Sequence, residues 1–244
     1  MQTIHVYSGK GVDGGALKQL IRSLQQETPC QIQRIDAKEL IESSWEQNSS
    51  LFIMPGGRDI FYHQDLEGRG TDKIRSYVES GGNYLGICAG AYFASSHIEF
   101  EKGGNLEVCG SRSLQFFPGI AWGPAYGPNQ YSYENTKGVK AARISSHLGE
   151  GHIYFNGGCA FNLNTSIEVM SRYLDLQTQP PAVIKRSFGK GLVILSGVHI
   201  EYRHCLLNTQ DPYLLEVIPL LQAAEPVRKA LFRSYLQSFN IPLN

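Results

Sequence analysis

Short apolar segments alternate with helix-forming segments through the first part of the chain, and this alternation constrains the fold more than any other feature. Apolar runs bounded by turn residues predict strands at 3–7, 51–54 and 84–87, and alternating apolar and polar residues predict one at 31–35. One-sided apolar stripes and N-capping residues predict helices at 15–26, 36–42 and 71–80. Strands spaced by helices in this way predict βαβ units and a parallel, doubly wound sheet.

The middle of the chain has a different character. Residues 100–165 are rich in glycine, proline, tyrosine, phenylalanine and asparagine, and short segments at 143–145 and 152–155 predict β-hairpins. We interpret this region as an antiparallel insertion or sheet edge within one domain that spans residues 1–244.

The last part of the chain completes the fold prediction. Segments 182–186 and 192–195 flank a Gly-Lys-Gly turn and predict a further hairpin, and a helical tail with a break at Pro226 follows. The predicted fold is a flavodoxin-like three-layer α/β/α domain. Its sheet is mostly parallel, with an antiparallel insertion and a helical C-terminal tail.

Charge balance and cysteine distribution argue against several classes of protein. Lysine plus arginine equals aspartate plus glutamate, 22 against 22, so nucleic acid is not an expected partner. No apolar stretch approaches the roughly 20 residues of a membrane helix, and the N-terminus lacks a signal-peptide pattern, so no membrane association is expected. The five cysteines form no CxxC pair, which favours reduced thiols in a cytoplasmic protein over disulfides or a zinc site. We expect no metal and no other cofactor.

The sharpest functional signal is the segment Gly86-Ile87-Cys88-Ala89-Gly90. A strand, then glycine–x–nucleophile–x–glycine, then a helix is the layout of a nucleophile elbow. The glycines are needed because the turn is tight and the helix passes close to the strand. Backbone N–H groups and the dipole at a helix N-terminus favour a thiolate. Cys88 is therefore the candidate nucleophile; the alternative is a small buried cysteine at the end of a core strand.

A cysteine nucleophile also needs a base, and the candidate follows the last predicted strand in the sequence SGVHIE. In an extended segment His199 and Glu201 point to the same side, because strand side chains repeat every second residue. Glu201 would then orient the imidazole that activates Cys88. The alternative is an ordinary loop histidine beside a solvated glutamate, and His204 and Glu216 are nearby competing candidates.

A third motif, Pro55-Gly56-Gly57, follows the predicted strand 51–54. Backbone N–H groups there could join the N–H of Ala89 in stabilising an oxyanion, although a simple turn is the alternative. All three motifs follow apolar strands, and strand ends form the ligand crevice in sheets of this kind.

Two further segments bear on that crevice. Aromatic residues of the middle region could wall it or could simply pack within an irregular insertion: Phe116, Phe117, Trp122, Tyr126, Tyr131 and Tyr133. The glycine-rich turn SGKGVDGG after the first strand lacks the spacing of a phosphate-binding loop, so nucleotide binding is not expected.

Taken together, GICAG, HIE and PGG resemble the class I glutamine amidotransferase superfamily. More closely, the chain resembles the N-terminal domain of eukaryotic-type biotin–protein ligases, here standing alone. The matching segments are MPGGRDIFY, YLGICAGAYFAS, LEVCGSRSLQFFPGIAWGPAYG, YFNGGCAF, PAVIKRSFGKG and SGVHIEY. The resemblance implies triad roles for Cys88, His199 and Glu201, and oxyanion and substrate-carbonyl contacts from Gly56, Gly57 and Ala89.

Two departures modify what the resemblance implies. Typical glutaminases of this class carry Gln or His after the second glycine of the elbow, where this chain has Ala91 and Tyr92, so glutamine is not the expected substrate. The chain also lacks the biotinyl-adenylate loop of biotin ligases and is not expected to ligate biotin. The predicted function is cysteine-dependent amidotransfer or amide hydrolysis on a small molecule. The open alternatives are a non-catalytic small-molecule-binding or regulatory module, and a partner-dependent subunit of a ligase or synthetase.

Overall fold

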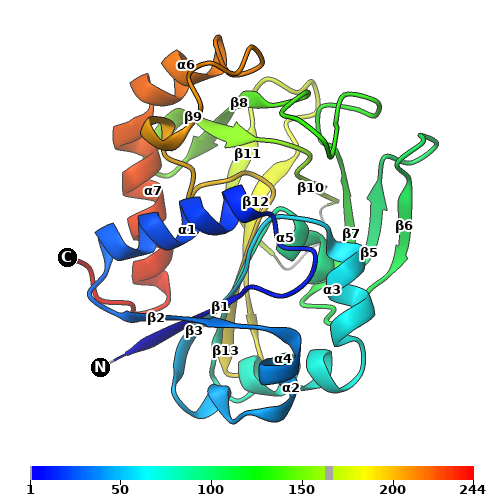
Figure 1. The fold of residues 1–244 in the computed structure, drawn as a ribbon, viewed down its shortest axis with the longest axis vertical. Helices are drawn as coiled ribbons and strands as arrows, with labels where there is room; N and C mark the ends of the chain where they lie inside the picture. The colour runs from blue at the N-terminus through cyan, green and yellow to red at the C-terminus, as the bar shows by residue number, and fades with distance from the viewer. Residues whose placement is uncertain (1, 163–166) are drawn as a thin grey trace.

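A large twisted sheet organises the chain in the computed structural model, which describes residues 2–162 and 167–244 (Figure 1). The strands are β1 (Thr3–Tyr7), β2 (Gln31–Ile35), β3 (Ser49–Met54), β4 (Asn83–Ile87), β5 (Ser95–Phe100), β6 (Val108–Ser111), β7 (Phe117–Gly123), β8 (Lys140–Ser146), β9 (Gly149–Phe155), β10 (Ala160–Phe161), β11 (Glu168–Tyr173), β12 (Pro181–Phe188) and β13 (Gly191–Ser196). Within the described ranges the large sheet has the order β2-β1-β3-β4-β13-β12-β11-β8-β9. The first five strands in this order run parallel to one another, and the remaining pairings, from β13–β12 onward, are antiparallel. The parallel half has the flavodoxin-like order, which confirms the predicted fold class.

The helices cover both faces of this sheet. They are α1 (Gly14–Glu27), α2 (Ala37–Glu42), α3 (Asp59–Leu66), α4 (Arg69–Glu79), α5 (Ala89–Phe93), α6 (Val217–Ala223) and α7 (Glu225–Ser238), with short 3-10 helices η1 (Trp45–Gln47) and η2 (His204–Leu206). No helix within the described part of the chain is both long and apolar enough to cross a membrane.

Local sequence signals explain where several helices begin. The Asp13 carboxylate accepts a hydrogen bond from the N–H of Ala16 at 2.7 Å and caps α1. Asp36 caps α2 as predicted, within a capping box. Pro226 lies in the first turn of α7, where its missing N–H costs no helical hydrogen bond, so the predicted break is confirmed.

The predicted start of α4 is wrong by two residues. The helix begins at Arg69 rather than Thr71, after Gly68, whose φ of 81° turns the chain into the helix. The Thr71 hydroxyl donates to the carbonyl oxygen of Gly68 at 3.0 Å instead of accepting from the following backbone. Thr71 is therefore inside the first turn and is not the cap.

Alternate residues of the central strands enter two separate hydrophobic cores. In β3, Leu51 and Ile53 pack with α1 and α7, whereas Phe52 and Met54 pack with α3, α4 and α5. All four side chains are fully buried, and each such burial contributes about 1.5–3 kcal/mol. Figure 1 shows α1 and α7 on one side of the sheet and α3 and α5 on the other, which gives the three layers.

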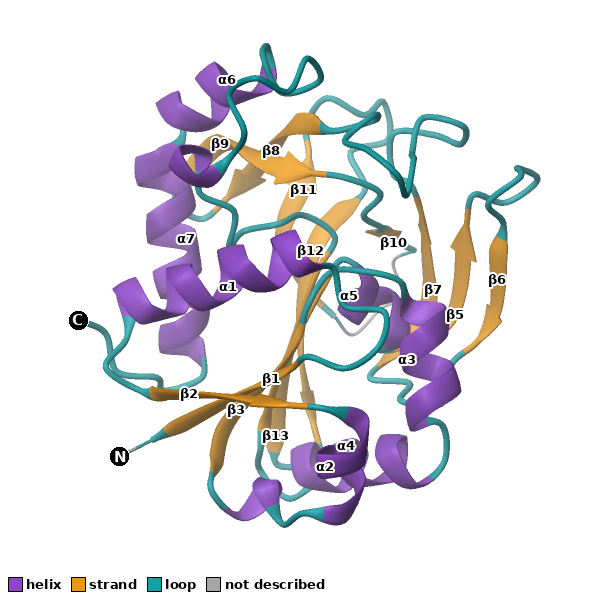
Figure 2. Cartoon of the chain, in the orientation of Figure 1, coloured by secondary structure: helices purple, strands orange, loops and turns teal. Residues whose placement is uncertain are grey.

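The middle of the chain does more than extend the large sheet. The predicted hairpin is confirmed as β8 and β9, which form the antiparallel edge. However, β10, β7, β5 and β6 form a separate four-stranded sheet within the described residues (Figure 2). In it β5 and β7 are parallel, because β6 returns antiparallel to β5 before β7 pairs with the opposite edge of β5. The insertion is thus a mixed sheet in this part.

Candidate active site

Cys88 lies on a sharp turn between β4 and α5. Its backbone has φ 51° and ψ −106°, a conformation that residues other than glycine seldom adopt. The N–H of Cys88 donates to the carbonyl oxygen of Ser196 at 2.8 Å and ties the turn to the end of β13. The side chain is 6% exposed, and its Sγ lies 3.8 Å from the carbonyl oxygen of Asn156. The strained turn therefore holds the thiol in one direction.

The two glycines of the elbow are required by close backbone approaches, as the sequence predicted. A Cβ atom on Gly86 would lie 2.6 Å from the carbonyl oxygen of Gly90. A Cβ atom on Gly90 would lie 2.0 Å from the carbonyl oxygen of Met54, at the end of β3. Helix α5 can start beside both strands only because these residues have no side chain.

His199 reaches the elbow because β13 lies parallel to β4 in the sheet. Ser196 is paired with Ile87, so the residues that follow the two strands emerge at the same edge. The N–H of His199 donates to the carbonyl oxygen of Tyr154 at 2.8 Å, which fixes its backbone. Its Nδ1 lies 2.7 Å from Oε1 of Glu201, and the Cys88 side chain is near enough to its ring to raise the pKa of the imidazole. The imidazole is thus hydrogen-bonded to the carboxylate of Glu201, at the same sheet edge as Cys88.

The electrostatics of this cluster favour a charged imidazole. Burial lowers the pKa of His199, but the negative charges of Glu201 and Cys88 and the hydrogen bonds to both residues raise it, to about 10. Glu201 is fully buried, and among the described residues its Oε2 atom has no hydrogen-bond partner. At neutral pH the His199 ring is therefore an imidazolium, held against the buried side chain of Glu201 and beside Cys88.

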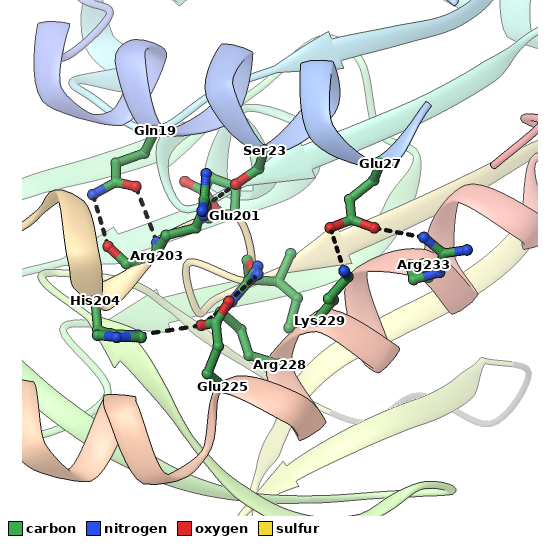
Figure 3. A network of polar contacts seen from close by, with 11 residues as sticks. Gln19, Ser23, Glu27, Glu201, Arg203, His204, Glu225, Arg228, Lys229 and Arg233 are labelled. Carbon is green, nitrogen blue, oxygen red and sulfur yellow. Dashed lines mark hydrogen bonds and ion pairs between the residues drawn. The ribbon is translucent and has the colours of Figure 1, made fainter. Parts of the chain in front are cut away.

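A network from two helices holds the segment that carries His199 and Glu201 (Figure 3). Its bonds to main-chain atoms are Ser23 Oγ to Glu201 O (2.7 Å), Gln19 Nε2 to Arg203 O (3.3 Å), Arg203 N to Gln19 Oε1 (3.0 Å) and Arg228 Nη1 to Ile200 O (2.7 Å). Glu225 binds the other guanidinium nitrogens of Arg228 at 2.9 and 2.8 Å. Because α1 and α7 clamp the backbone, the imidazole and the carboxylate keep their relative position.

The competing candidates named from the sequence do not join this cluster. His204 pairs with Glu225 at 3.6 Å in the outer network, and Glu216 is exposed. Within residues 2–162 and 167–244, no group of three or more histidine, cysteine, aspartate or glutamate side chains could hold a metal ion.

The Pro-Gly-Gly turn has structural reasons for both glycines. A Cβ atom on Gly56 would lie 2.6 Å from Cε1 of His199, so the imidazole packs directly on this backbone. Gly57 has φ 151°, and a Cβ atom there would lie 2.1 Å from the carbonyl oxygen of Gly11. The N–H of Arg58 donates to that same oxygen at 2.8 Å. The backbone N–H of Arg58 is therefore not available to an oxyanion. Gly57 and the elbow residue Ala89 line the cavity walls beside Cys88.

A cleft of about 660 Å³ opens beside Cys88 and His199. Residues 11–16 of the glycine-rich turn and helix α1 line it, together with parts of segments 131–136 and 206–214. The hydroxyl of Thr136 donates to Asp211 at 2.7 Å and joins the last two walls. A small annex of about 20 Å³ adjoins the cleft at Cys88, and Tyr92 and Phe100 are among the residues that line it. The thiol thus lies between a wide cleft and a narrow annex.

Only part of the predicted aromatic wall is present. Tyr131 and Tyr133 line both the cleft and the annex. The other aromatic residues named from the sequence pack into the two hydrophobic cores: Trp122, Tyr126, Phe116 and Phe117. The reason is that the second sheet and the large sheet bury them, and sequence alone did not reveal that sheet.

Several residues at the cleft were not predicted from the sequence. Asp13 and Arg58 follow β1 and β3, and their positions after parallel strands were the available signal. Tyr154 and Tyr202 stack with ring centroids 4.1 Å apart, and both rings contact the imidazole of His199 edge-on. These tyrosines come from distant segments, so no local pattern marks them.

Comparison with known proteins places this fold in a family. A family model described as "Biotin-protein ligase, N terminal" matches residues 2–244. The chain belongs to this biotin–protein ligase N-terminal family. An uncharacterized protein of Chlamydia muridarum is 46% identical over 223 residues, covering 86% of this chain and 85% of that protein. The biotin–protein ligase of Schizosaccharomyces pombe is 36% identical over 210 residues, covering 81% of this chain but only 33% of the ligase.

Solved structures show how the biotin–protein ligase N-terminal fold relates to others. A glutamine amidotransferase structure superposes with a TM-score of 0.59 at 19% identity, covering 89% of this chain and 97% of that chain. A glutamine amidotransferase of Thermotoga maritima superposes with a TM-score of 0.58 at 12% identity, covering 98% and 97%. The resemblance stated from the sequence is confirmed at the level of family and fold.

Proposed function

We propose that this member of the biotin–protein ligase N-terminal family catalyses acyl transfer from an amide, through Cys88. The observation that carries the proposal is the His199 imidazole held between Glu201 and Cys88. A cysteine at a strained elbow, a base in contact with it and a carboxylate that orients the base are the parts of a nucleophilic triad.

The chemistry follows from the charges of the cluster. The Cys88 thiolate attacks the carbonyl carbon of the amide, and the N–H groups of Ala89 and of the Gly56–Gly57 turn stabilise the oxyanion. His199, already protonated, gives its proton to the leaving nitrogen as the C–N bond breaks. Water or an amine, deprotonated by the now neutral His199, then attacks the thioester and releases Cys88. We also propose a cytoplasmic location, because all five cysteines, each within the described residues, are free thiols.

Covalent trapping tests the proposal. We expect a panel of electrophilic ketones that mimic primary amides, including a glutamine analogue, to form an adduct on Cys88 that peptide mass spectrometry locates. The His199→Gln variant is expected to form that adduct at least about a hundredfold more slowly, as general acid–base catalysis contributes factors of that size. Adducts on Cys109 and Cys205 with Cys88 unmodified across the panel would contradict the proposal.

Glutamine itself is expected to be a poor substrate. Ala91 is buried and lines neither the cleft nor the annex. Tyr92 lines the annex beside Cys88, and its hydroxyl donates to the carbonyl oxygen of Gly157 at 3.2 Å. We therefore expect the purified chain to release little or no ammonia or glutamate from glutamine. The assay compares wild type with Cys88→Ala, and a robust turnover that depends on Cys88 would show that the pocket accepts glutamine.

A second candidate function is a binding or regulatory module, or a subunit that acts beside a ligase or synthetase. The narrow annex and the low exposure of Cys88 favour it. The Schizosaccharomyces pombe ligase also contains the matched region as about a third of its length. The trapping panel separates the candidates, since a pure binding module would give no His199-dependent adduct on Cys88.

A further inference from the structure

We infer that the acyl donor of this cleft carries a carboxylate and that Arg58 binds it. The inference rests on the proposed function and names the substrate class of the same site. Arg58 lines both the cleft and the annex, as Cys88 does. A ligand group held by Arg58 is therefore close to the reacting sulfur.

The backbone of Arg58 is fixed although its side chain is exposed. The residue follows Gly57 at the end of β3 and stands at the start of α3. Its N–H donates to the carbonyl oxygen of Gly11 at 2.8 Å, which joins the turn to the loop after β1. The side chain of Arg58 is therefore presented to the cleft and the annex from a fixed backbone.

Two aromatic rings hold the guanidinium of Arg58. Its carbon lies 4.1 Å from the ring centroid of Tyr133 and 5.0 Å from that of Phe61. Arg58 also hydrogen-bonds to the Tyr133 side chain, and the other N–H donors of the planar guanidinium remain for a ligand. This is the geometry in which arginine recognises a carboxylate through two parallel hydrogen bonds.

The charge of Arg58 is not neutralised within the protein. Among the described residues no carboxylate lies within ion-pair distance of its guanidinium, and the neighbouring Asp59 is paired with buried Arg112 at 2.8 Å. Three carboxylates line the cleft: Asp13 caps α1, Asp211 accepts from a threonine, and Glu134 makes no ion pair with Arg58 among the described residues. Arg58 therefore offers an uncompensated positive charge beside the nucleophile.

The sizes of the annex and the cleft indicate where the carboxylate of the substrate would lie. The annex of about 20 Å³ admits only a few atoms, so the reacting end of the substrate occupies the space at Cys88. Arg58 stands where annex and cleft meet, so the carboxylate lies a short distance along the substrate. The remainder of the molecule, or the accepting amine, would occupy the wide cleft.

Matched electrophiles test the inference. Iodoacetate and iodoacetamide differ in charge but hardly in size, so their alkylation rates at one thiol report the local preference for an anion. Using intact and peptide mass spectrometry, we expect the iodoacetate-to-iodoacetamide rate ratio to be about tenfold or more higher at Cys88 than at exposed Cys205 in the same molecule. Arg58→Gln should remove this preference, and Arg58→Lys should keep part of it.

The controls keep this inference distinguishable from the proposed function. Arg22→Gln removes the same charge from an exposed position on α1 that does not line the cleft, and it should leave the ratio unchanged. Melting temperatures of the variants check folding. If Cys88 reacts rapidly but Arg58→Gln leaves the ratio as in wild type, the carboxylate inference is overturned and the proposed function stands. If Cys88 reacts with neither reagent in the wild type, the proposed function is overturned, and this inference with it.

Discussion

Iodoacetamide at near-neutral pH is expected to modify Cys88 well before the other cysteines of the folded protein. Access alone predicts the opposite order, because Cys109 and Cys205 are exposed whereas Cys88 is 6% exposed. The expectation rests on the place of Cys88 at the start of α5 and on the positive charge of the nearby His199 ring, surroundings that activate a cysteine. Burial raises the pKa of both Cys109 and Cys159, the latter strongly, and disfavours their thiolates.

The size of the effect follows from the fraction of thiolate. An ordinary cysteine is a few per cent thiolate at pH 7, so full activation of a thiol would make it react about ten- to thirtyfold faster at equal access. Peptide mass spectrometry over a time course measures the five rates, with Cys88→Ala and urea-unfolded protein as controls. In the unfolded chain the five rates should converge. Cys88 among the slowest to label in the folded chain would overturn its assignment as nucleophile.

Replacing Glu201 by glutamine is expected to have the second large effect. Glutamine preserves the shape of the side chain but removes the negative charge that raises the pKa of His199 to about 10. The pKa of His199 should therefore fall, and alkylation of Cys88 should slow by about a hundredfold as the imidazolium is lost. Breaking a buried pair of this kind costs about 3–5 kcal/mol of unfolding free energy.

The stability difference between wild type and Glu201→Gln should change with pH in a definite direction. The pKa of His199 is higher in the folded chain than its ordinary value of 6.5, so its contribution to stability is fully present below pH 6.5. That contribution is lost as the pH rises through about 10. The stability advantage of wild type over Glu201→Gln should therefore shrink between these two values.

Two measurements check the Glu201 prediction. Nuclear magnetic resonance of the His199 ring follows its titration, and urea unfolding at several pH values follows the stability difference. Glu216→Gln is a matched control, because Glu216 is exposed and does not contact the cluster. A His199 titration that is the same in Glu201→Gln and in wild type would show that the carboxylate does not govern the imidazole.

Much of the parallel half of the fold could be predicted because its signals are local. Apolar runs mark β1, β3 and β4, and their order in the chain alternates with amphipathic helices. The separate sheet of β10, β7, β5 and β6 could not be predicted, since it depends on pairing between strands that leave no periodic pattern. The parallel contact between β5 and β7 arises from the path of the chain around β6.

The sequence by itself determined the chemistry that this protein can offer. The elbow around Cys88 and the spacing of His199 and Glu201 are short-range features, because a tight turn needs glycines and an extended segment faces alternate residues together. Tertiary structure alone decided that these segments meet. The pairing of β13 with β4 brings residues more than a hundred positions apart to one sheet edge. Tertiary structure also formed the cleft. Its lining residues come from separate segments whose packing no local pattern encodes, among them Arg58, Tyr133, Tyr154 and Tyr202.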